Sequence, residues 1–278
     1  MSKDAGMLIC RSVPVFFALL HYYSFSCIIK AMKSIKKKKT VIAALAVLFA
    51  ALFGLAVTKL IRVREARTNG ILLCFDDYDE YNWSEYFDLL EKYDAHVTYF
   101  VIIEEPTDFC FEAIKRGHEI GYHSLAHTTV ADMDGWDELY KYTIAPIETF
   151  RERGIELTTF AYPEGRGYPG SDEELLKYYK VIRGANELIF YGKDQLRHGF
   201  VDAVSIDNIH FENDEIYKAY IDRLLDNFNG NVGGVQIVFT HTIGDGGWCL
   251  GEERLEYLLS EAKKRGIKFY TFKKLQDN

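Results

Sequence analysis

From about residue 70 onward, short apolar runs alternate with longer amphipathic stretches. The apolar runs are rich in β-branched and aromatic residues, a pattern that predicts buried strands. These runs cover residues 71–75, 96–102, 119–122, 157–162, 235–240 and 267–272. The amphipathic stretches predict helices over residues 83–93, 109–116, 134–153, 172–179, 212–228 and 252–265. Because strands and helices alternate, we expect a parallel α/β sheet, either open or closed into a barrel.

No repeat, low-complexity tract or linker interrupts residues 70–278, so we predict a single domain there. The chain as a whole is 48% hydrophobic and 15% aromatic, which excludes a disordered or collagen-like protein. In parallel α/β folds, ligands bind beyond the carboxyl ends of the strands. Polar residues at those ends are therefore the first candidates for chemistry.

The amino-terminal region follows another pattern, because residues 40–58 form an apolar run of 19 residues without a charge. As a helix this run would be roughly 28 Å long, about the thickness of a bilayer's hydrocarbon core. Lysines at positions 33 and 36–39 precede it, and the positive-inside rule then places residues 1–39 in the cytoplasm.

We therefore predict a transmembrane signal-anchor at residues 40–58 and a juxtamembrane linker at residues 59–69. The domain at residues 70–278 would then be extracytoplasmic, at the cell surface or in the periplasm. A cleavable signal peptide is the alternative to a retained anchor. The methionine at position 32 would make a conventional start for an exported protein, in which case residues 1–31 lie upstream of the true start.

The net charge of −8 conceals an uneven distribution of charged residues. Residues 1–69 contain 12 Lys and Arg against 2 Asp and Glu, whereas the rest of the chain contains 21 against 39. An acidic body of this kind repels phosphate backbones, which excludes nucleic acid as a partner. The five cysteines are too scattered for a disulfide scaffold or a cysteine-rich zinc module.

Two of the predicted strands end in residues that can bind a metal. Asp76 and Asp77 directly follow the strand at residues 71–75, and buried carboxylates need a cation or a hydrogen-bond donor. His123 and His127 follow the strand at residues 119–122, and their spacing predicts two imidazoles on one face of a helical turn. Each pair alone also fits an ordinary turn or cap. Together they supply two nitrogens and one oxygen, a catalytic-type zinc site with a position left open for water.

Two further strand ends carry candidate residues. The turn Tyr162-Pro163-Glu164-Gly165 follows the strand at residues 157–162, and such a turn can direct a backbone N–H toward an oxyanion. His241 ends the strand at residues 235–240 and is a candidate general acid. Trp248 lies in the glycine-rich loop that follows and is a candidate for stacking on a sugar ring.

Taken together, these motifs resemble the NodB-homology polysaccharide deacetylases, carbohydrate esterase family 4. The resemblance extends over residues 70–278 and is strongest in Phe75-Asp76-Asp77 and in the run from Gly117 to His127. It continues in the same order through residues 160–165 and 238–241. It implies a distorted (β/α) barrel that hydrolyses N-acetyl groups on an amino-sugar polymer.

The resemblance also implies a role for each candidate. It assigns the divalent metal to Asp77, His123 and His127. Asp76 would be the general base for the attacking, metal-activated water, and His241 would protonate the departing amine. The backbone N–H of Glu164 would stabilise the oxyanion.

Three positions depart from the common pattern of this family. Tyr78 stands where many members have glycine and would narrow the entrance. Ala161 stands where many have the arginine that orients the base, and Arg183 would replace that arginine from another strand, as in relatives with the Phe-Ala-Tyr-Pro form. Glu164 replaces an aromatic residue, a change that concerns substrate binding more than chemistry.

The sequence therefore predicts a membrane-anchored, metal-dependent polysaccharide deacetylase, a hydrolase of linear amides, whose partner is an acetylated amino-sugar polymer. Peptidoglycan, chitin-like oligomers and poly-N-acetylglucosamine all fit, and the sequence does not determine the oligomeric state. Zinc is the first expectation for the metal, with cobalt and nickel as alternatives, because His and Asp ligands suit several first-row ions. Two other functions stay open: an O-acetyl esterase acting on xylan or another glycan, and a carbohydrate-binding protein without turnover.

Overall fold

The computed structural model describes residues 48–49, 53, 69–186, 189, 191, 195–230 and 234–276. The predicted segments 1–39 and 59–68 lie outside the described residues, as does the predicted anchor at 40–58 apart from Leu48, Phe49 and Phe53. Within the part that is described, no helix combines the length and the apolar character needed to span a membrane. The anchor remains a prediction. The described residues from position 69 onward form one compact unit.

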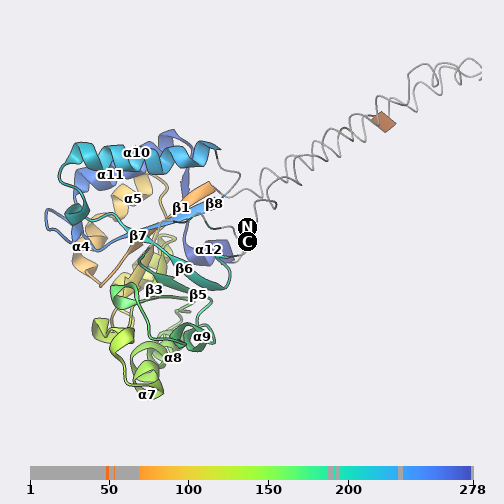
Figure 1. Cartoon of the computed structure of the whole chain (residues 1–278), viewed down its shortest axis with the longest axis vertical. Coiled ribbons are helices and arrows are strands. Elements are labelled where there is room, and N and C mark those ends of the chain that lie inside the picture. The colour runs from red at the N-terminus through yellow and green to blue at the C-terminus, as the bar shows by residue number, and fades with distance from the viewer. Residues whose placement is uncertain are drawn as a thin grey trace, which may run out of the picture. The chain divides into compact units, whose positions relative to one another are not determined.

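A long parallel sheet is the centre of this unit (Figure 1). Its strands run in the spatial order β6-β5-β4-β3-β2-β1-β8-β7, and a short strand, β11, also pairs with β1. Their bounds are β1 Asn69–Phe75, β2 Thr98–Val101, β3 Glu119–Tyr122, β4 Thr159–Ala161, β5 Val181–Gly184, β6 Gly199–Asp202, β7 Val204–Ser205, β8 Gly234–Thr240 and β11 Lys268–Phe269. A separate pair consists of β9 Thr242–Ile243 and β10 Cys249–Leu250.

The sheet closes on itself through one extended segment, residues 199–205. Its first half, β6, pairs with β5, and its second half, β7, pairs with β8 at the other end of the strand order. Ala203 stands between the two halves and donates its backbone N–H to Gly184. The predicted barrel, rather than an open sheet, is therefore the architecture of this domain.

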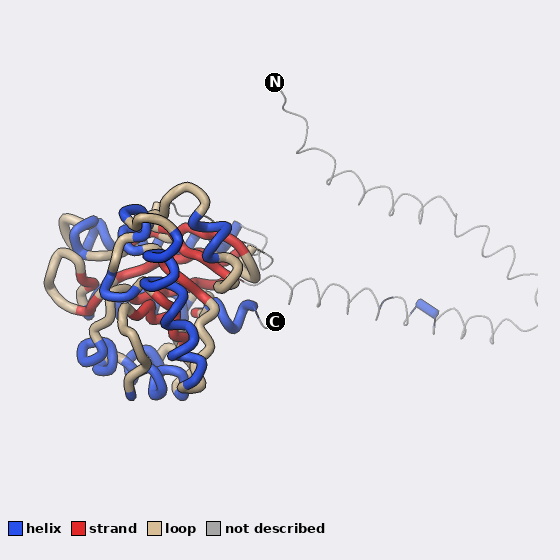
Figure 2. The backbone as a smooth tube through the Cα atoms, turned by 90° about the horizontal axis from the view of Figure 1, so that it is seen from below, coloured by secondary structure: helices blue, strands red, loops and turns tan. Residues whose placement is uncertain are grey.

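Helices surround the strands on the outside (Figure 2). Their bounds are α4 Glu80–Glu85, α5 Phe87–Lys92, α6 Asp108–Lys115, α7 Trp136–Leu139, α8 Ala145–Glu152, α9 Ser171–Leu175, α10 Asp214–Gly230, α11 Glu252–Lys264 and α12 Phe272–Gln276. In Figure 1, α10 and α11 lie together on one side of the sheet, and α7, α8 and α9 lie on the opposite side.

Two hydrophobic clusters arise from the alternation of side chains along the strands. Leu72 and Cys74 of β1 belong to the cluster inside the barrel, whereas Ile71, Leu73 and Phe75 belong to the cluster between strands and helices. This follows from the two-residue period of a strand, which sends successive side chains to opposite faces. Residues 72 and 74 face the inside of the barrel, and Asp76 is the next residue with this orientation. The inward-facing positions of β1 therefore lead to the site.

The end of the barrel at which the strands begin is closed by α12. Phe272 of this helix is fully buried and packs edge-on against Phe100 inside the barrel, with the ring centroids 6.2 Å apart. The backbone N–H of Lys273 donates to the buried carboxylate of Glu119, at the start of β3. With this end filled, the pocket described below lies at the end where the strands finish.

The structure corrects several predicted elements. The helix expected at 134–153 is divided into α7 and α8 by a π-helical turn at Tyr140–Ile144, because Pro146 has no N–H to continue an α-helical ladder. The helix expected at 83–93 is divided at Tyr86 into α4 and α5. The strand expected at 267–272 is only β11, because Phe272 already begins α12. The strands β6 and β7 were not predicted.

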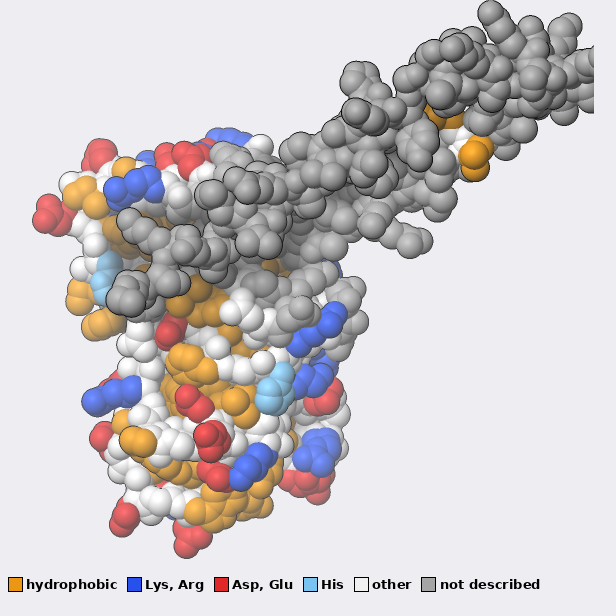
Figure 3. Space-filling model, turned by 45° about the vertical axis from the view of Figure 1, so that its right-hand side comes forward, with side chains coloured by type: hydrophobic (Ala, Val, Ile, Leu, Met, Phe, Trp, Pro, Cys, Tyr) orange, Lys and Arg blue, Asp and Glu red, His pale blue; other side chains and the backbone are white. Residues whose placement is uncertain are grey.

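Charged side chains of both signs are interspersed on the face drawn in Figure 3, among white polar and orange apolar side chains. On that face the described residues form no broad basic patch.

Candidate active site

Four strands deliver polar side chains to one pocket at their carboxyl ends. Asp76 follows β1, His123 follows β3, Arg183 lies in β5 and His241 follows β8. All four line a pocket of about 390 Å³. Each of these four residues occupies an inward-facing position of its strand or of the strand's continuation. Their side chains therefore lie inside the barrel at its carboxyl end, between neighbouring parallel strands.

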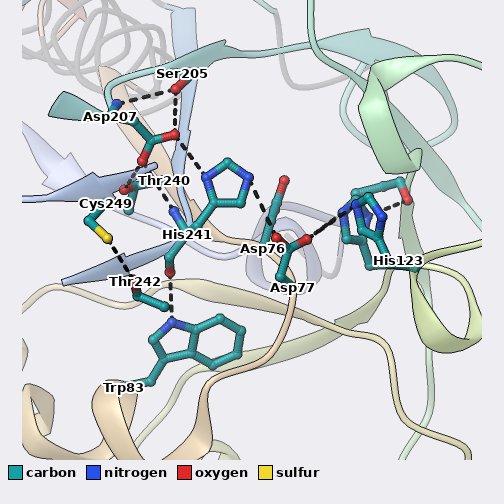
Figure 4. A network of polar contacts seen from close by, with 12 residues as sticks. Asp76, Asp77, Trp83, His123, Ser205, Asp207, Thr240, His241, Thr242 and Cys249 are labelled. Atoms are coloured by element: carbon teal, nitrogen blue, oxygen red, sulfur yellow. Dashed lines mark hydrogen bonds and ion pairs between the residues drawn. The ribbon is translucent and has the colours of Figure 1, made fainter. Parts of the chain in front are cut away.

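Three possible metal ligands lie together beside this pocket. The distance from Asp77 Oδ1 is 3.4 Å to His123 Nε2 and 3.4 Å to His127 Nε2. The ligand atoms of the three residues all lie within 4.8 Å of one another. Figure 4 shows the Asp77 carboxylate directed toward the His123 imidazole.

The backbone brings these residues together in a way that differs from the predicted helical turn. Ser124, Ala126 and His127 have φ values of 62°, 52° and 55°, in the left-handed region, so the segment is an irregular turn rather than an α-helix. The two imidazoles nevertheless lie 5.1 Å apart between ring centroids. Asp77 also has a positive φ, 83°, and so departs from the alternation of β1 that positions Asp76.

The donor set fits a divalent metal. His123 Nδ1 lies 2.8 Å from the carbonyl oxygen of Ala161, which accepts its N–H and leaves the Nε2 lone pair facing Asp77. Burial and the neighbouring His123 lower the pKa of His127, which favours the neutral imidazole that metals bind. Asp77 Oδ1 is buried and accepts no hydrogen bond from the described residues, an arrangement that a cation would satisfy.

A buried ion pair holds Asp76. Arg183 Nη2 donates to Asp76 Oδ2, and the two side chains are 1% and 3% exposed. The guanidinium of Arg183 also lies over two aromatic rings, 4.6 Å from the centroid of Phe239 and 5.2 Å from that of Phe100. Asp76 Oδ1 has no hydrogen-bond partner among the described residues, so this oxygen is available to a ligand in the pocket.

His241 is held by a carboxylate that the sequence reasoning missed. Its Nδ1 lies 2.8 Å from Asp207 Oδ2, and the Asp207 side chain is fully buried. Asp207 also accepts hydrogen bonds from the hydroxyls of Thr240 and Ser205 (Figure 4). The signal for Asp207 in the sequence is weak, because it follows β7, a strand of two residues.

The electrostatics of this pair favour a protonated imidazole. Burial by itself would lower the pKa of His241, but the hydrogen bond to Asp207 and the charges of Asp76, Asp207 and Asp77 outweigh it and raise that pKa. Burial would raise the pKa of Asp207, but the hydrogen bond with His241 and the other donors lower it. His241 is therefore suited to donate a proton.

The turn Pro163–Gly165 forms another part of the wall. Glu164 has a φ of 55° in this turn and lines the pocket together with Tyr162 and Gly165. The Tyr162 hydroxyl is anchored away from the metal ligands, through hydrogen bonds with Ser171 and Asp172. Pro163 is buried in the turn and does not line the pocket.

The pocket continues on both sides. A second pocket, of about 570 Å³, shares His127, Glu164, His241 and Trp248 with the first and extends to Tyr78, Asp79 and Thr242. A third, of about 370 Å³, shares Tyr162 and Gly165 with the first and extends to Tyr168, Asn186 and Phe200. We call these three adjoining spaces the groove. Trp248, with a 60% exposed side chain, lies in it with its ring 5.9 Å from that of His241.

Tyr78 lines the groove and is fixed in place by its own contacts. It has a φ of 93°, a conformation that glycine adopts without strain, and its ring packs edge-on against Trp83 and Phe109. Its hydroxyl bonds with Glu80 and Thr107. These contacts stabilise the left-handed backbone beside the candidate metal ligand Asp77.

Comparison with known proteins agrees with this fold. Residues 64–180 match the family model described as polysaccharide deacetylase, which confirms the resemblance that the motifs predicted. The matched part contains Asp76, Asp77, His123 and His127, whereas Arg183, Asp207 and His241 lie beyond it. No protein of curated function has a significantly similar sequence.

Solved structures with the same fold include enzymes of several kinds. The Xyl-CE4 domain of a multidomain xylanase from the hindgut metagenome of Trinervitermes trinervoides has a TM-score of 0.53 at 17% identity, over 76% of this chain and 90% of its own. The peptidoglycan deacetylase PdaC from Bacillus subtilis has a TM-score of 0.53 at 18% identity, over 76% and 92%. A family 4 acetyl xylan esterase from Clostridium thermocellum, in complex with a cobalt ion, has a TM-score of 0.50 at 20% identity, over 74% and 89%. These likenesses establish a deacetylase-type barrel.

Proposed function

We propose that this protein is a metal-dependent hydrolase that removes N-acetyl groups from an amino-sugar polysaccharide. One observation carries the proposal. A carboxylate paired with arginine, Asp76, and an imidazole paired with a carboxylate, His241, line the same pocket as His123 and His127 of the metal-ligand cluster. Sugar binding alone requires neither pair, whereas hydrolysis of an amide requires both a base and an acid.

Asp77, His123 and His127 would hold the metal, which when bound polarises an acyl carbonyl and lowers the pKa of a water near it. We propose zinc, because two imidazoles and one carboxylate with an open position are typical of catalytic zinc sites. Cobalt and nickel suit the same ligands.

Asp76 would accept the proton of the attacking water. Arg183 fixes its Oδ2, whereas its Oδ1 has no hydrogen-bond partner among the described residues and Asp76 lines the pocket. The aromatic rings of Phe100 and Phe239 keep water away from the guanidinium, so the pair holds one geometry. A base positioned in this way contributes about 10²–10⁴-fold to the rate.

His241 would donate a proton to the departing amine nitrogen. The Asp207 carboxylate keeps Nδ1 protonated and orients the ring, so Nε2 carries the proton to be transferred. An amine expelled without this proton would leave as an amide anion, which is a very poor leaving group. The backbone N–H of Glu164, in its left-handed turn, would stabilise the oxyanion.

The groove supports a polymeric substrate. A single sugar unit needs only the central pocket, whereas the side pockets on either side of it offer space for neighbouring units. The exposed indole of Trp248 offers an apolar face beside His241 for one sugar ring. We also propose that residues 40–58 anchor the domain in a membrane, on the strength of their uncharged apolar run and the lysines before it.

The test uses the full chain, stripped with a chelator and reconstituted with Zn²⁺, Co²⁺ or Ni²⁺. Acetate and new free amines are measured on N-acetylglucosamine oligomers and on peptidoglycan, and acetate alone on O-acetylated xylan. We expect metal-dependent amide hydrolysis that is lost in Asp76→Asn and His127→Ala. His198→Ala is the matched control, because His198 is exposed and its ring nitrogen bonds with the Leu176 carbonyl, outside the residues that line the pocket.

Three outcomes would contradict the proposal. Acetate from xylan without new amines on any amino sugar would identify an O-acetyl esterase. One equivalent of metal with no hydrolysis of either kind would identify a carbohydrate-binding protein. A chain that binds no metal would overturn the assignment of Asp77, His123 and His127.

A further inference from the structure

The loop that carries Trp248 has little conformational preference of its own. It begins after β9 and contains Gly244, Gly246 and Gly247. Glycine restricts the backbone least of all residues, so ordering such a loop has a high entropic cost. The position of Trp248 in the groove therefore depends on contacts from outside the loop.

The start of the β9 segment is anchored by α4. The Trp83 indole donates to the carbonyl oxygen of His241 at 2.7 Å (Figure 4), and the Asn82 amide exchanges two hydrogen bonds of 2.8 Å with the backbone of Ile243. These contacts end at Ile243. The two ends of the loop are joined by the pairing of β9 with β10 and by the backbone N–H of Gly244, which donates to the Leu250 carbonyl at 3.0 Å. The carbonyl groups of the glycine-rich part between these ends are left to be fixed by other residues.

Asn208 supplies that contact. Its Nδ2 donates to the carbonyl oxygens of Gly244 at 2.9 Å and Gly246 at 3.0 Å. The backbone N–H of the next residue, Ile209, donates to Gly247 at 2.8 Å. Three hydrogen bonds from Asn208 and Ile209 thus hold the loop, up to the residue before Trp248.

The same amide has a second set of partners. Asn208 Oδ1 accepts from the backbone N–H of Gly251 and from Arg254 Nη1, both at 3.1 Å, at the start of α11. Because Oδ1 faces two donors and Nδ2 faces two carbonyls, the partners define the orientation of the amide. The side chain therefore connects the loop to a rigid helix.

Trp248 lies at the end of this loop between two imidazoles. Its ring centroid is 5.9 Å from that of His241 and 6.1 Å from that of His210, at interplanar angles of 81° and 83°. Both contacts are edge-on, which leaves 60% of the side chain exposed. The indole lines both the central pocket and the pocket toward Tyr78.

We propose that Asn208 is a positioning residue for substrate binding, which holds the glycine-rich loop so that Trp248 presents its indole to a sugar ring next to His241. The inference rests on the proposed function. Two consecutive residues then have separate tasks, because Asp207 orients the proton donor and Asn208 orients the surface that binds the sugar. Loss of Asn208 weakens binding without altering proton transfer.

The first measurement is spectroscopic and needs no activity. In a Trp136→Phe background the remaining tryptophans are Trp83, which is buried, and Trp248. We expect Asn208→Ala to lower the fluorescence anisotropy of Trp248 and to increase its quenching by acrylamide, with a Trp248→Phe variant to assign the signal. Asn213→Ala is the matched control, since Asn213 caps the start of α10 by accepting the N–H of Ile216.

The second measurement separates KM from kcat. We expect Asn208→Ala to raise KM for N-acetylglucosamine oligomers on the order of tenfold, as the loss of the two hydrogen bonds to the loop implies. We expect kcat and the pH profile to stay close to those of the unmodified protein. A mere loss of folded protein would lower the apparent kcat and leave KM unchanged.

Asn208→Asp distinguishes the loop from the helix. The aspartate retains an acceptor for Gly251 and Arg254 but places an oxygen against the carbonyls of Gly244 and Gly246. If Asn208 only supports α11, aspartate restores KM and anisotropy, and the proposal is wrong. If Asn208 holds the loop, aspartate is at least as harmful as alanine.

Failure of the proposed function is recognised separately. If the unmodified protein hydrolyses no acetylated substrate, binding of N-acetylglucosamine oligomers is measured from the change in Trp248 fluorescence. Weaker oligomer binding by Asn208→Ala then supports the positioning role in a binding protein. Equal oligomer binding by Asn208→Ala and by the unmodified protein overturns it.

Discussion

Replacing Asp207 by asparagine tests the source of the proton that hydrolysis requires. The carboxylate lies 2.8 Å from His241 Nδ1 and is fully buried, so its charge is not screened by water. An asparagine oxygen can still accept the Nδ1 proton, and the ring keeps its orientation. The substitution therefore removes the charge of the partner while leaving the geometry in place.

The magnitude follows from the value of a charged hydrogen bond. A hydrogen bond to an ionised group contributes about 1.5–3 kcal/mol. Asparagine keeps a neutral hydrogen bond, which contributes about 0.5–1.5 kcal/mol, so the substitution removes only the difference of about 1–1.5 kcal/mol. At about 1.4 kcal/mol for each pKa unit, this difference lowers the pKa of His241 by about 1 unit. His241 must be protonated to act as an acid, so the alkaline limb of the kcat/KM profile should move to lower pH by the same amount.

The assay is acetate release from N-acetylglucosamine oligomers between about pH 5 and pH 10, with metal at saturation. Ser205→Ala is the control, because it removes one neutral donor to Asp207 and leaves the carboxylate. We expect its alkaline limb to move by much less than that of Asp207→Asn. An alkaline limb that is identical in Asp207→Asn and the unmodified protein would refute the assignment of His241 as the general acid.

Three further predictions concern the metal, the buried ion pair and the acid stability. Asp77→Asn should weaken Zn²⁺ binding by more than about 100-fold, measured by competition with a chelator. The reason is that losing a residue that binds the metal should cost more affinity than losing a residue that only hydrogen-bonds to a ligand. Unchanged Zn²⁺ affinity would contradict the site. Arg183→Met should lower the free energy of unfolding, measured in urea, by about 3–5 kcal/mol, because Asp76 is left buried without its cation. The double variant with Asp76→Leu should recover much of this lost stability, because it no longer buries an unpaired charge. Burial, followed by the charges of His96 and Arg116, lowers the pKa of His118 in the folded protein to about 3. As the pH falls below about 6.5, His118 therefore takes up a proton in the unfolded chain but not in the folded protein. Stability should then fall by up to about 1.4 kcal/mol per pH unit below pH 6.5, and His118→Gln should reduce that slope; an equal slope in both proteins would exclude His118 as its cause.

The apolar runs of the strands made the barrel predictable. Residues 70–75 of β1 and all of β8 are continuous runs of buried residues, and such runs are recognised without knowledge of their neighbours. The elements that failed were those that depend on tertiary packing. The segment at residues 199–205 forms strands because two edges of the sheet are available to it, and its own sequence alternates only weakly.

The candidate site was predictable to the extent that its chemistry lies at strand ends. Parallel strands gather their carboxyl ends at one edge, so Asp76, His123 and His241 could be expected in one place before the structure was known. The identity of the side chains and their order along the chain were enough for that step.

What only the tertiary structure decided is which of these groups are paired. Asp76 and Arg183 are 107 residues apart, and they meet because β1 and β5 face each other across the barrel. Asp207 and Asn208 follow a strand of two residues, and their roles depend on the register of β7 against β8. The left-handed backbone at Tyr78 and Ala126 is stabilised by surrounding contacts and not by local preference. Local composition thus determines which strands form and which chemistry they carry, whereas partners, register and strained backbone are determined by contacts between residues that are distant in the chain.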